Sequence, residues 1–254
     1  MSTVPAFALV LGATVGSFVT VIAYRLPRGE GWVTGRSRCP ACGTQIAAYD
    51  NVPVLSWLML RGRCRSCHVP ISMRYPLAEL ALGLSFAGTY VALGPQDLGA
   101  LALGLAFCTV LVTITLTDLE RRVIPNKVVL AGAIAAIAIA AVSEPSSLGE
   151  RGIGAAGAGG ALLLIALAYP RGMGMGDVKL VAMMGLYLGA AVVPALLVGF
   201  LAGALVGSGL IAKHGSAARK RAIAFGPFLA LGGIVGLWFG DAIVAWYVAE
   251  FFAA

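Results

Sequence analysis

Charged residues are scarce in this chain of 254 residues. Lys, Arg, Asp and Glu make up 11% of it, whereas hydrophobic residues make up 59%. An average soluble domain carries about 25% charged residues. The shortage of charge excludes a soluble enzyme, a disordered chain and a small disulfide scaffold. A membrane β-barrel is also excluded, because its alternating strands rarely give long uncharged runs. The composition therefore predicts an all-α polytopic membrane protein.

Several long stretches contain no charged residue at all. They cover residues 1–24, 80–96, 98–117, 128–143, 152–170, 180–212 and 222–240. A membrane helix needs about 20 apolar residues, with roughly 17 to 25 tolerated. Residues 180–212 are too many for one crossing, and Pro194 is a candidate break between two short helices. We therefore predict about eight transmembrane helices.

Basic residues are nearly absent from one side of this predicted arrangement. The segments that hold 17 of the 18 Lys and Arg residues are 25–74, 118–127, 171–179 and 213–221. Cytoplasmic loops of membrane proteins are enriched in these residues, so the pattern predicts a bacterial inner-membrane protein with its N-terminus on the outer side of that membrane. No basic residue precedes the first apolar stretch, and we expect that stretch to be retained as a helix. The net charge of +7 then belongs to the inner membrane surface and gives no argument for nucleic acid.

The polar segment after the first helix contains two Cys-x-x-Cys pairs. They are Cys39 with Cys42 and Cys64 with Cys67, separated by 21 residues. Two such pairs supply the four soft ligands of a closed tetrahedral Zn²⁺ site. Disulfides are the main alternative, disfavoured in a reducing cytoplasm. A haem-attachment motif ending at His68 is a further alternative, but it leaves the first pair unexplained.

Two aspartates lie at the ends of predicted membrane helices on the cytoplasmic side. Asp118 follows one apolar stretch, and Asp177 follows Gly174 and Gly176 just before another. Ionisable groups in such places cost free energy unless they function or have partners. Two carboxylates brought together can share a proton and activate water, as in aspartic proteases. Ordinary ion pairs with neighbouring Arg and Lys residues are the alternative.

Further motifs surround these cysteines and aspartates. They are Gly16-Ser-Phe18, Arg25-Leu-Pro27, Asn51-Val-Pro-Val-Leu-Ser-Trp57, Arg61-Gly-Arg-Cys64, Pro70-Ile-Ser-Met-Arg-Tyr-Pro-Leu-Ala-Glu79, Gly174-Met-Gly-Asp177-Val-Lys179 and Phe225-Gly-Pro-Phe-Leu-Ala-Leu-Gly232. In this order the motifs resemble the bacterial type IV prepilin peptidases, membrane aspartic proteases of the GxGD class. The resemblance runs over most of the chain.

The resemblance implies an activity and a set of site residues. Asp118 and Asp177 would be the protease pair that cuts prepilins and pilin-like secretion subunits after the Gly that ends a basic leader. Full-length members then methylate the new N-terminal residue with S-adenosylmethionine, and a Zn²⁺ loop is associated with those members. One departure is Thr20, where the family commonly has Asn.

The resemblance also suggests further site residues and a division of the chain. Gly174, Gly176 and Lys179 are candidates for a loop of the active site, and Gly62, Arg74 and Glu79 are candidates for the methyl-transfer surface. No Rossmann-like Gly-rich pattern marks a pocket for S-adenosylmethionine. The expected parts are a first helix over 1–24, a cytoplasmic zinc loop with four cysteine ligands over 25–76 and a protease core over 77–254.

Three rival functions fit parts of the pattern. One is a peptidase that does not methylate its product. Another is a zinc-stabilised membrane transporter or channel with Asp118 and Asp177 on an ion path, although a path predicts charges at mid-span. The third is a non-enzymatic scaffold for pilus assembly, which would tolerate loss of both carboxylates.

Overall fold

Helices make up nearly all of the regular structure in the computed structural model, which describes residues 3–31, 36–170, 172–215 and 224–252. The chain divides into two compact units, Met1–Val91 and Ala92–Ala254. Arg171 and most of the basic segment 213–221 lie outside the described residues, so the described structure does not bear on them.

The first unit consists of two long helices and a cysteine-rich segment between them. The long helices are α1 (Thr3–Arg25) and α3 (Arg74–Leu93), whose last two residues extend past the unit. The intervening chain contains the short elements η1 (Leu26–Arg28), η2 (Ala48–Asn51) and α2 (Leu55–Met59). We refer to residues 36–73 as the cysteine lobe.

Glycines allow α1 and α3 to pack closely. A Cβ atom at Gly12 would lie 2.7 Å from the Leu82 carbonyl oxygen, and one at Gly16 would lie 2.8 Å from Glu79 Cα. Neither position has room for a side chain. Small residues at helix interfaces are how membrane helices approach each other without a hydrophobic driving force.

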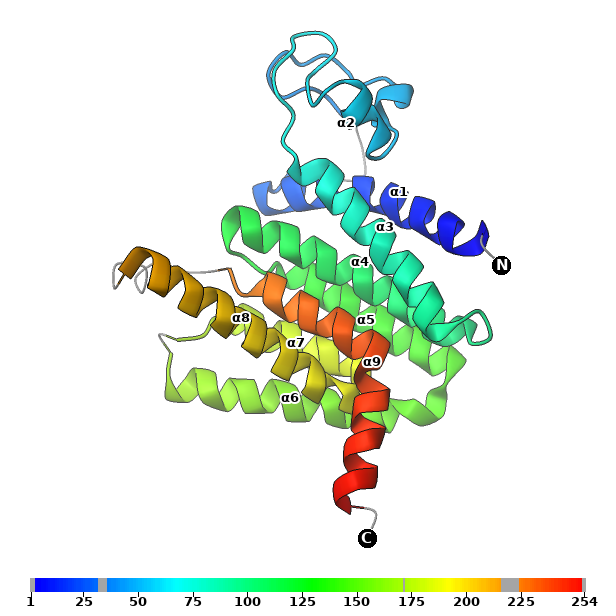
Figure 1. Ribbon diagram of the computed structural model, residues 1–254, viewed down its shortest axis with the longest axis vertical. Helices are drawn as coiled ribbons and strands as arrows, with labels where there is room; N and C mark the ends of the chain where they lie inside the picture. The colour runs from blue at the N-terminus through cyan, green and yellow to red at the C-terminus, as the bar shows by residue number, and fades with distance from the viewer. Residues whose placement is uncertain (1–2, 32–35, 171, 216–223, 253–254) are drawn as a thin grey trace. The chain divides into compact units, whose positions relative to one another are not determined.

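The second unit is a bundle of long helices. They are α4 (Leu98–Arg121), α5 (Asn126–Ser143), α6 (Leu148–Ala168), α7 (Met175–Leu188), α8 (Val192–His214) and α9 (Gly226–Phe252), with short turns η3 (Pro145–Ser147) and η4 (Gly189–Ala191). Figure 1 shows these helices side by side, with the end of α9 turning away from the rest.

Helix α7 is the central element of this bundle. It contacts α4, α5, α6, α8 and α9, and eight of its 14 residues are buried. At about 1.5 Å per residue it is only about 21 Å long, less than the bilayer core. Longer helices surround α7, so protein rather than lipid covers most of its surface.

The described helices confirm the predicted polytopic fold. Seven helical stretches among the described residues are long and apolar enough to cross a membrane. One of them, Met175–His214, has 40 residues, about 60 Å of helix, or about twice the bilayer core. It divides into α7 and α8, so the described residues form eight long helices.

The predicted break at Pro194 was wrong in position. The chain breaks at Gly189, whose φ of 54° and ψ of −129° suit a residue without a Cβ. Pro194 lies in the first turn of α8, where the missing N–H has no helical partner to lose.

The predicted end of the last span was also wrong. The uncharged run stops at residue 240, but α9 continues through Asp241 and Glu250 to Phe252. The backbone hydrogen bonds that continue a helix do not depend on side-chain charge, so a single charged residue does not end it.

Candidate active site and metal centre

Asp118 lies near the end of α4, in a buried place. Its side chain is 6% exposed, and its Oδ2 accepts a hydrogen bond from the Gly226 N–H at 2.7 Å. Gly226 is the first residue of α9. A Cβ at this position would lie 2.8 Å from the same oxygen, so only glycine fits here.

Asp177 lies in the first turn of α7, three residues after the Gly174 cap. It is half-buried, and its carboxylate is hydrogen bonded to the backbone at Gly174. A Cβ at Gly174 would lie 3.3 Å from Asp177 Oδ2, which is tight. Because Gly174 has no side chain, its backbone can lie close to the Asp177 carboxylate.

The bundle brings the two carboxylates near each other. Their charges interact between α4 and α7 although 59 residues separate them in sequence. Each also meets the N-terminus of a helix: Asp177 lies in the first turn of α7, and Asp118, from the end of α4, accepts a hydrogen bond from Gly226 at the start of α9. Helix N-termini carry about half a positive charge and stabilise anions. The arrangement therefore suits two acidic groups that share one proton.

The chain between α4 and α5, together with the first residue of α5, contacts the start of α7. A Cβ at Gly176 would lie 3.1 Å from the Ile124 side chain, and Lys179 Nζ donates to Asn126 Oδ1 at 3.1 Å. The predicted loop residues Gly174, Gly176 and Lys179 thus lie at the start of α7, near the aspartates. Their contact with a substrate stays a prediction.

Gly226 was not assigned a role from the sequence. The signal was present, since the Phe225-Gly-Pro motif lies near the start of the uncharged stretch 222–240. Its role lies in a contact with Asp118, 108 residues earlier, which no local pattern reveals. Ile124 and Asn126 were missed for the same reason.

The four predicted cysteines of the cysteine lobe come together. Their sulfur atoms all lie within 4.8 Å of one another, and the Sγ atoms of Cys39 and Cys67 are 3.7 Å apart. Zinc–sulfur bonds of about 2.3 Å place the sulfurs of a tetrahedral site about 3.8 Å apart. All five cysteines of the chain are free of disulfides. The donor set fits Zn²⁺ and argues against the disulfide alternative.

Each cysteine pair lies on the same type of turn. The matching hydrogen bonds are Cys39 N–H to Thr44 O, Gly43 N–H to Cys39 O, Cys64 N–H to Val69 O and His68 N–H to Cys64 O, all 2.9 or 3.0 Å. Gly43 has a φ of 71° and His68 a φ of 57° at equivalent positions. Two copies of one turn face each other, so the second pair is part of the four-cysteine group rather than a haem site.

Local hydrogen bonds favour the thiolate form that a metal requires. The Thr44 hydroxyl and backbone lower the pKa of Cys42 to about 6. Backbone N–H groups of Cys67 and Ser66 lower the pKa of Cys64. Burial and hydrogen bonds with the other three cysteines instead raise the pKa of Cys67. Thiolates are the zinc-binding form of cysteine, so the turns favour this form at Cys42 and Cys64 but not at Cys67.

The three residues suggested for a methyl-transfer surface have different surroundings. Gly62 has a φ of 65°, and a Cβ there would lie 2.7 Å from the Trp57 ring. Arg74 is exposed at the start of α3. Glu79 is buried, and its Oε2 accepts from the Val54 N–H at 2.7 Å. No hydrogen bond among the described residues joins the three, and their role stays a prediction.

The fold and these two centres define a class. The chain is a multi-pass helical membrane protein with a pair of helix-end aspartates and a four-cysteine lobe.

Comparisons with known proteins then give the family. Residues 10–93 match the bacterial peptidase A24 N-terminal domain, and residues 105–210 match the type IV leader peptidase family. A prepilin leader peptidase/N-methyltransferase of Aeromonas hydrophila is 37% identical, over 93% of this chain and 91% of that protein. Proteins of the same name from Burkholderia pseudomallei and Bacillus subtilis are 37% and 30% identical, over 92% and 94% of this chain and 85% and 96% of theirs. No solved structure matches the chain. The chain belongs to the type IV leader peptidase family.

Proposed function

We propose that this protein cleaves the leader of type IV prepilins and pilin-like secretion subunits and then methylates the new N-terminus. The family and the names of the relatives support both activities. The single observation that carries the proteolytic part is the convergence of Asp118 and Asp177 at one end of the bundle. No metal ligand set lies beside them among the described residues.

The chemistry proposed for this pair is that of an aspartic protease. One carboxylate is ionised and removes a proton from water, while the other is protonated and donates a hydrogen bond to the scissile carbonyl oxygen. Water attacks the carbonyl carbon, and the proton is returned to the leaving amine. The Gly226 N–H holds one oxygen of Asp118 and leaves its other oxygen for the reaction.

The proposed topology explains why the site lies at a helix end. With the N-terminus outside, the cysteine lobe and both aspartates face the cytoplasm in the inner membrane. A prepilin is held in the membrane by its apolar N-terminal helix, so its basic leader and scissile bond reach this surface. The starting turn of α7, with Gly174, Gly176 and Lys179, is the proposed contact for the extended leader.

The proposed division of labour follows the three parts of the chain. Residues 1–24 anchor the lobe, residues 25–76 carry structural Zn²⁺ on Cys39, Cys42, Cys64 and Cys67, and residues 77–254 form the protease. The metal would organise its own loop, because metal binding and local folding are coupled. Methyl transfer takes its methyl group from S-adenosylmethionine, with Gly62, Arg74 and Glu79 as the proposed surface.

The decisive experiment replaces each carboxylate by an amide. Asp118→Asn and Asp177→Asn should each abolish leader cleavage of a prepilin with a Gly–Phe junction, while the protein still inserts and accumulates. Glu120→Gln is the matched control, because Glu120 is an exposed carboxylate two residues from Asp118. Mass spectrometry of the substrate reports cleavage. An inactive Glu120→Gln with an active Asp118→Asn would overturn the assignment.

A further inference from the structure

The segment 52–59 of the cysteine lobe displays an unusual amount of apolar surface. Val52, Leu55, Leu58 and Met59 are exposed by 44%, 58%, 58% and 81%. They lie on and just before α2. Clustered exposed apolar side chains on a small lobe mark an interaction site rather than ordinary surface.

A hydrogen bond fixes the depth of this segment relative to the membrane helices. Val54 N–H donates to Glu79 Oε2 at 2.7 Å, and Glu79 lies about 8 Å along α3 from its start at Arg74. Glu79 packs against Gly16, which lies about 14 Å before the end of α1. The start of α2 is therefore held at the level of Glu79 on α3 and Gly16 on α1, rather than beyond the ends of these two membrane-spanning helices.

The backbone is strained to achieve this placement. Val54 has a φ of 61° and a ψ of −50°, a conformation rare for any side chain and more so for a β-branched one. A backbone conformation of this kind persists only where the surrounding structure holds it. Ser56 supplies a second hold, because its Oγ accepts from Val52 N–H and donates to Tyr49 O.

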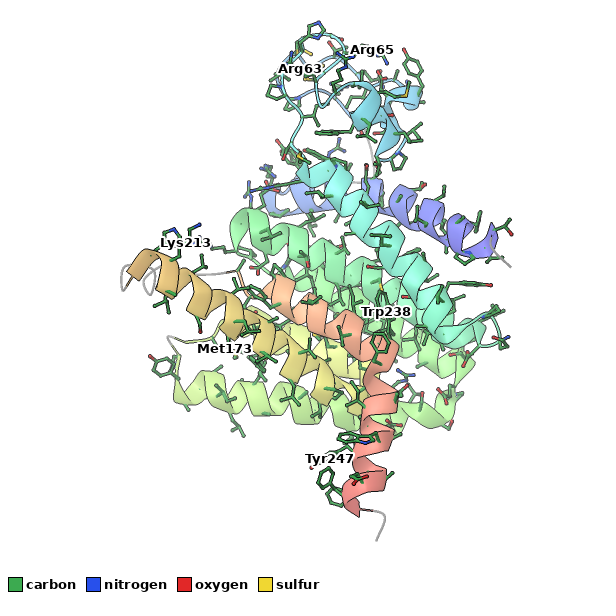
Figure 2. All side chains as sticks on the ribbon, in the orientation of Figure 1. Arg63, Arg65, Met173, Lys213, Trp238 and Tyr247 are labelled. Carbon is green, nitrogen blue, oxygen red and sulfur yellow. The ribbon has the colours of Figure 1, made fainter. Side chains whose placement is uncertain are left out.

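The opposite side of the lobe is polar. Figure 2 shows Arg63 and Arg65 projecting from the lobe on the side away from α3. Arg65 forms a two-point ion pair with Asp50, at 2.8 and 2.6 Å. The lobe thus exposes apolar side chains on and just before α2 and charged side chains at Arg63 and Arg65, and such an amphipathic surface is typical of a structure that lies at a membrane surface.

We propose that residues 52–59 form an interfacial anchor that inserts into the phospholipid bilayer where headgroups meet acyl chains. Insertion occurs on the side where α1 ends and α3 begins. Peripheral apolar segments of this kind enter by about 5–10 Å. The anchor fixes the height of the four-cysteine centre above the membrane. This inference does not depend on the proposed enzymatic activity.

The test uses a photoreactive benzoylphenylalanine in place of Met59 in the full chain. The protein is reconstituted in nanodiscs of phosphatidylethanolamine and phosphatidylglycerol, irradiated and analysed by mass spectrometry. Arg63 is the control position, because it projects from the same lobe on its charged side. Phospholipid adducts should be several-fold more abundant at position 59 than at position 63.

Other crosslinks would overturn the proposal. Crosslinks from position 59 to peptides of residues 92–254 would show that the bundle covers the segment. Crosslinks between two copies would show a dimer contact, and equal lipid adducts at 59 and 63 would show no insertion. Leu58 is a second position for the probe, so a protein that fails to accumulate with the probe at 59 does not end the test.

Discussion

The cysteine lobe and the aspartate site are built in different ways. In the lobe, each cysteine pair is placed by hydrogen bonds within a turn of a few residues. In the bundle, Asp118, Asp177 and Gly226 come from the ends of three helices, 59 and 49 residues apart. The lobe is therefore specified locally, whereas the aspartate site depends on how whole helices pack. The two centres should fail through different substitutions.

Among substitutions that leave both carboxylates and all four cysteines in place, the largest effect should come from a methyl group at the α9 contact. In Gly226→Ala, the added Cβ would lie 2.8 Å from Asp118 Oδ2, so the carboxylate or α9 must move. A misplacement of about 1 Å at a catalytic group can cost about 100-fold in rate. We expect cleavage to fall by about that factor, as measured by mass spectrometry of a prepilin substrate.

Gly157→Ala is the matched control for this change. Gly157 also lies in a helix of the bundle, but a Cβ there meets no atom within 4 Å. Alanine is favoured over glycine inside helices by about 1 kcal/mol, so this variant should fold and cleave at least as well. If the two variants cleaved equally well, Gly226 would not position Asp118.

The next effect tests whether the lobe fails alone. Cys64→Ser removes one thiolate of the four-cysteine group, so bound zinc should be lost, as measured by elemental analysis. Methyl transfer should fall more than cleavage, because the bundle does not use the metal. Both are read from one mass spectrum of the pilin substrate.

Two comparisons sharpen this experiment. Ser66→Ala, on the same turn, keeps the backbone hydrogen bond to Cys64 and should retain zinc and both activities. Asp177→Asn should methylate a pre-cleaved peptide that begins with Phe. Equal loss of cleavage and methylation in a folded Cys64→Ser protein would show that the lobe helps to build the protease site.

The difference between the centres also explains what the sequence could predict. The Cys-x-x-Cys spacing identifies all four candidate ligands, because each pair is positioned by a turn of a few consecutive residues. The uncharged runs predict the membrane helices, because the bilayer imposes a length on them. The family resemblance, stated from ordered motifs, is confirmed by the comparisons.

Contacts between segments that are distant in the sequence could not be predicted from these local patterns. The sequence predicted the helix break at Pro194 rather than at Gly189, because proline is the stronger local signal of a break. Proline also fits the first turn of a helix, which is where Pro194 lies. The Gly226 contact with Asp118 and the Val54 contact with Glu79 link distant segments through a backbone N–H. Every residue except proline has such a group, so residue type carries no signal of its partner.

A smaller effect is expected at a contact inside the bundle. Tyr187 of α7 donates to the Gly132 carbonyl oxygen of α5 at 2.8 Å and stacks on Phe107 of α4 at 4.7 Å. Tyr187→Phe removes only the hydrogen bond. Hydrogen bonds between membrane helices average about 0.6 kcal/mol, so thermal stability in detergent should fall slightly.

Cleavage should fall with stability in Tyr187→Phe, while zinc content is unchanged. Tyr247→Phe is the control, because Tyr247 is exposed on α9 and labelled in Figure 2. A stability loss in Tyr247→Phe as large as that in Tyr187→Phe would mean that the buried bond contributes nothing specific.

The smallest effect should be a gain, in the second cysteine turn. His68 has a φ of 57° where the first turn has Gly43 at 71°, and the left-handed conformation costs a side-chain-bearing residue about 1–2 kcal/mol. Glycine avoids this cost but loses about 0.4–1 kcal/mol through the greater freedom of the unfolded chain. His68→Gly should therefore stabilise the lobe by about 1 kcal/mol or less.

Competition with a zinc chelator measures this stabilisation as slower loss of metal from His68→Gly. Gly43→Ala should accelerate the loss, because it creates the same strain in the other turn. If His68→Gly lost metal faster than the parent protein, the imidazole itself would contribute to the site, and the two turns would not be equivalent.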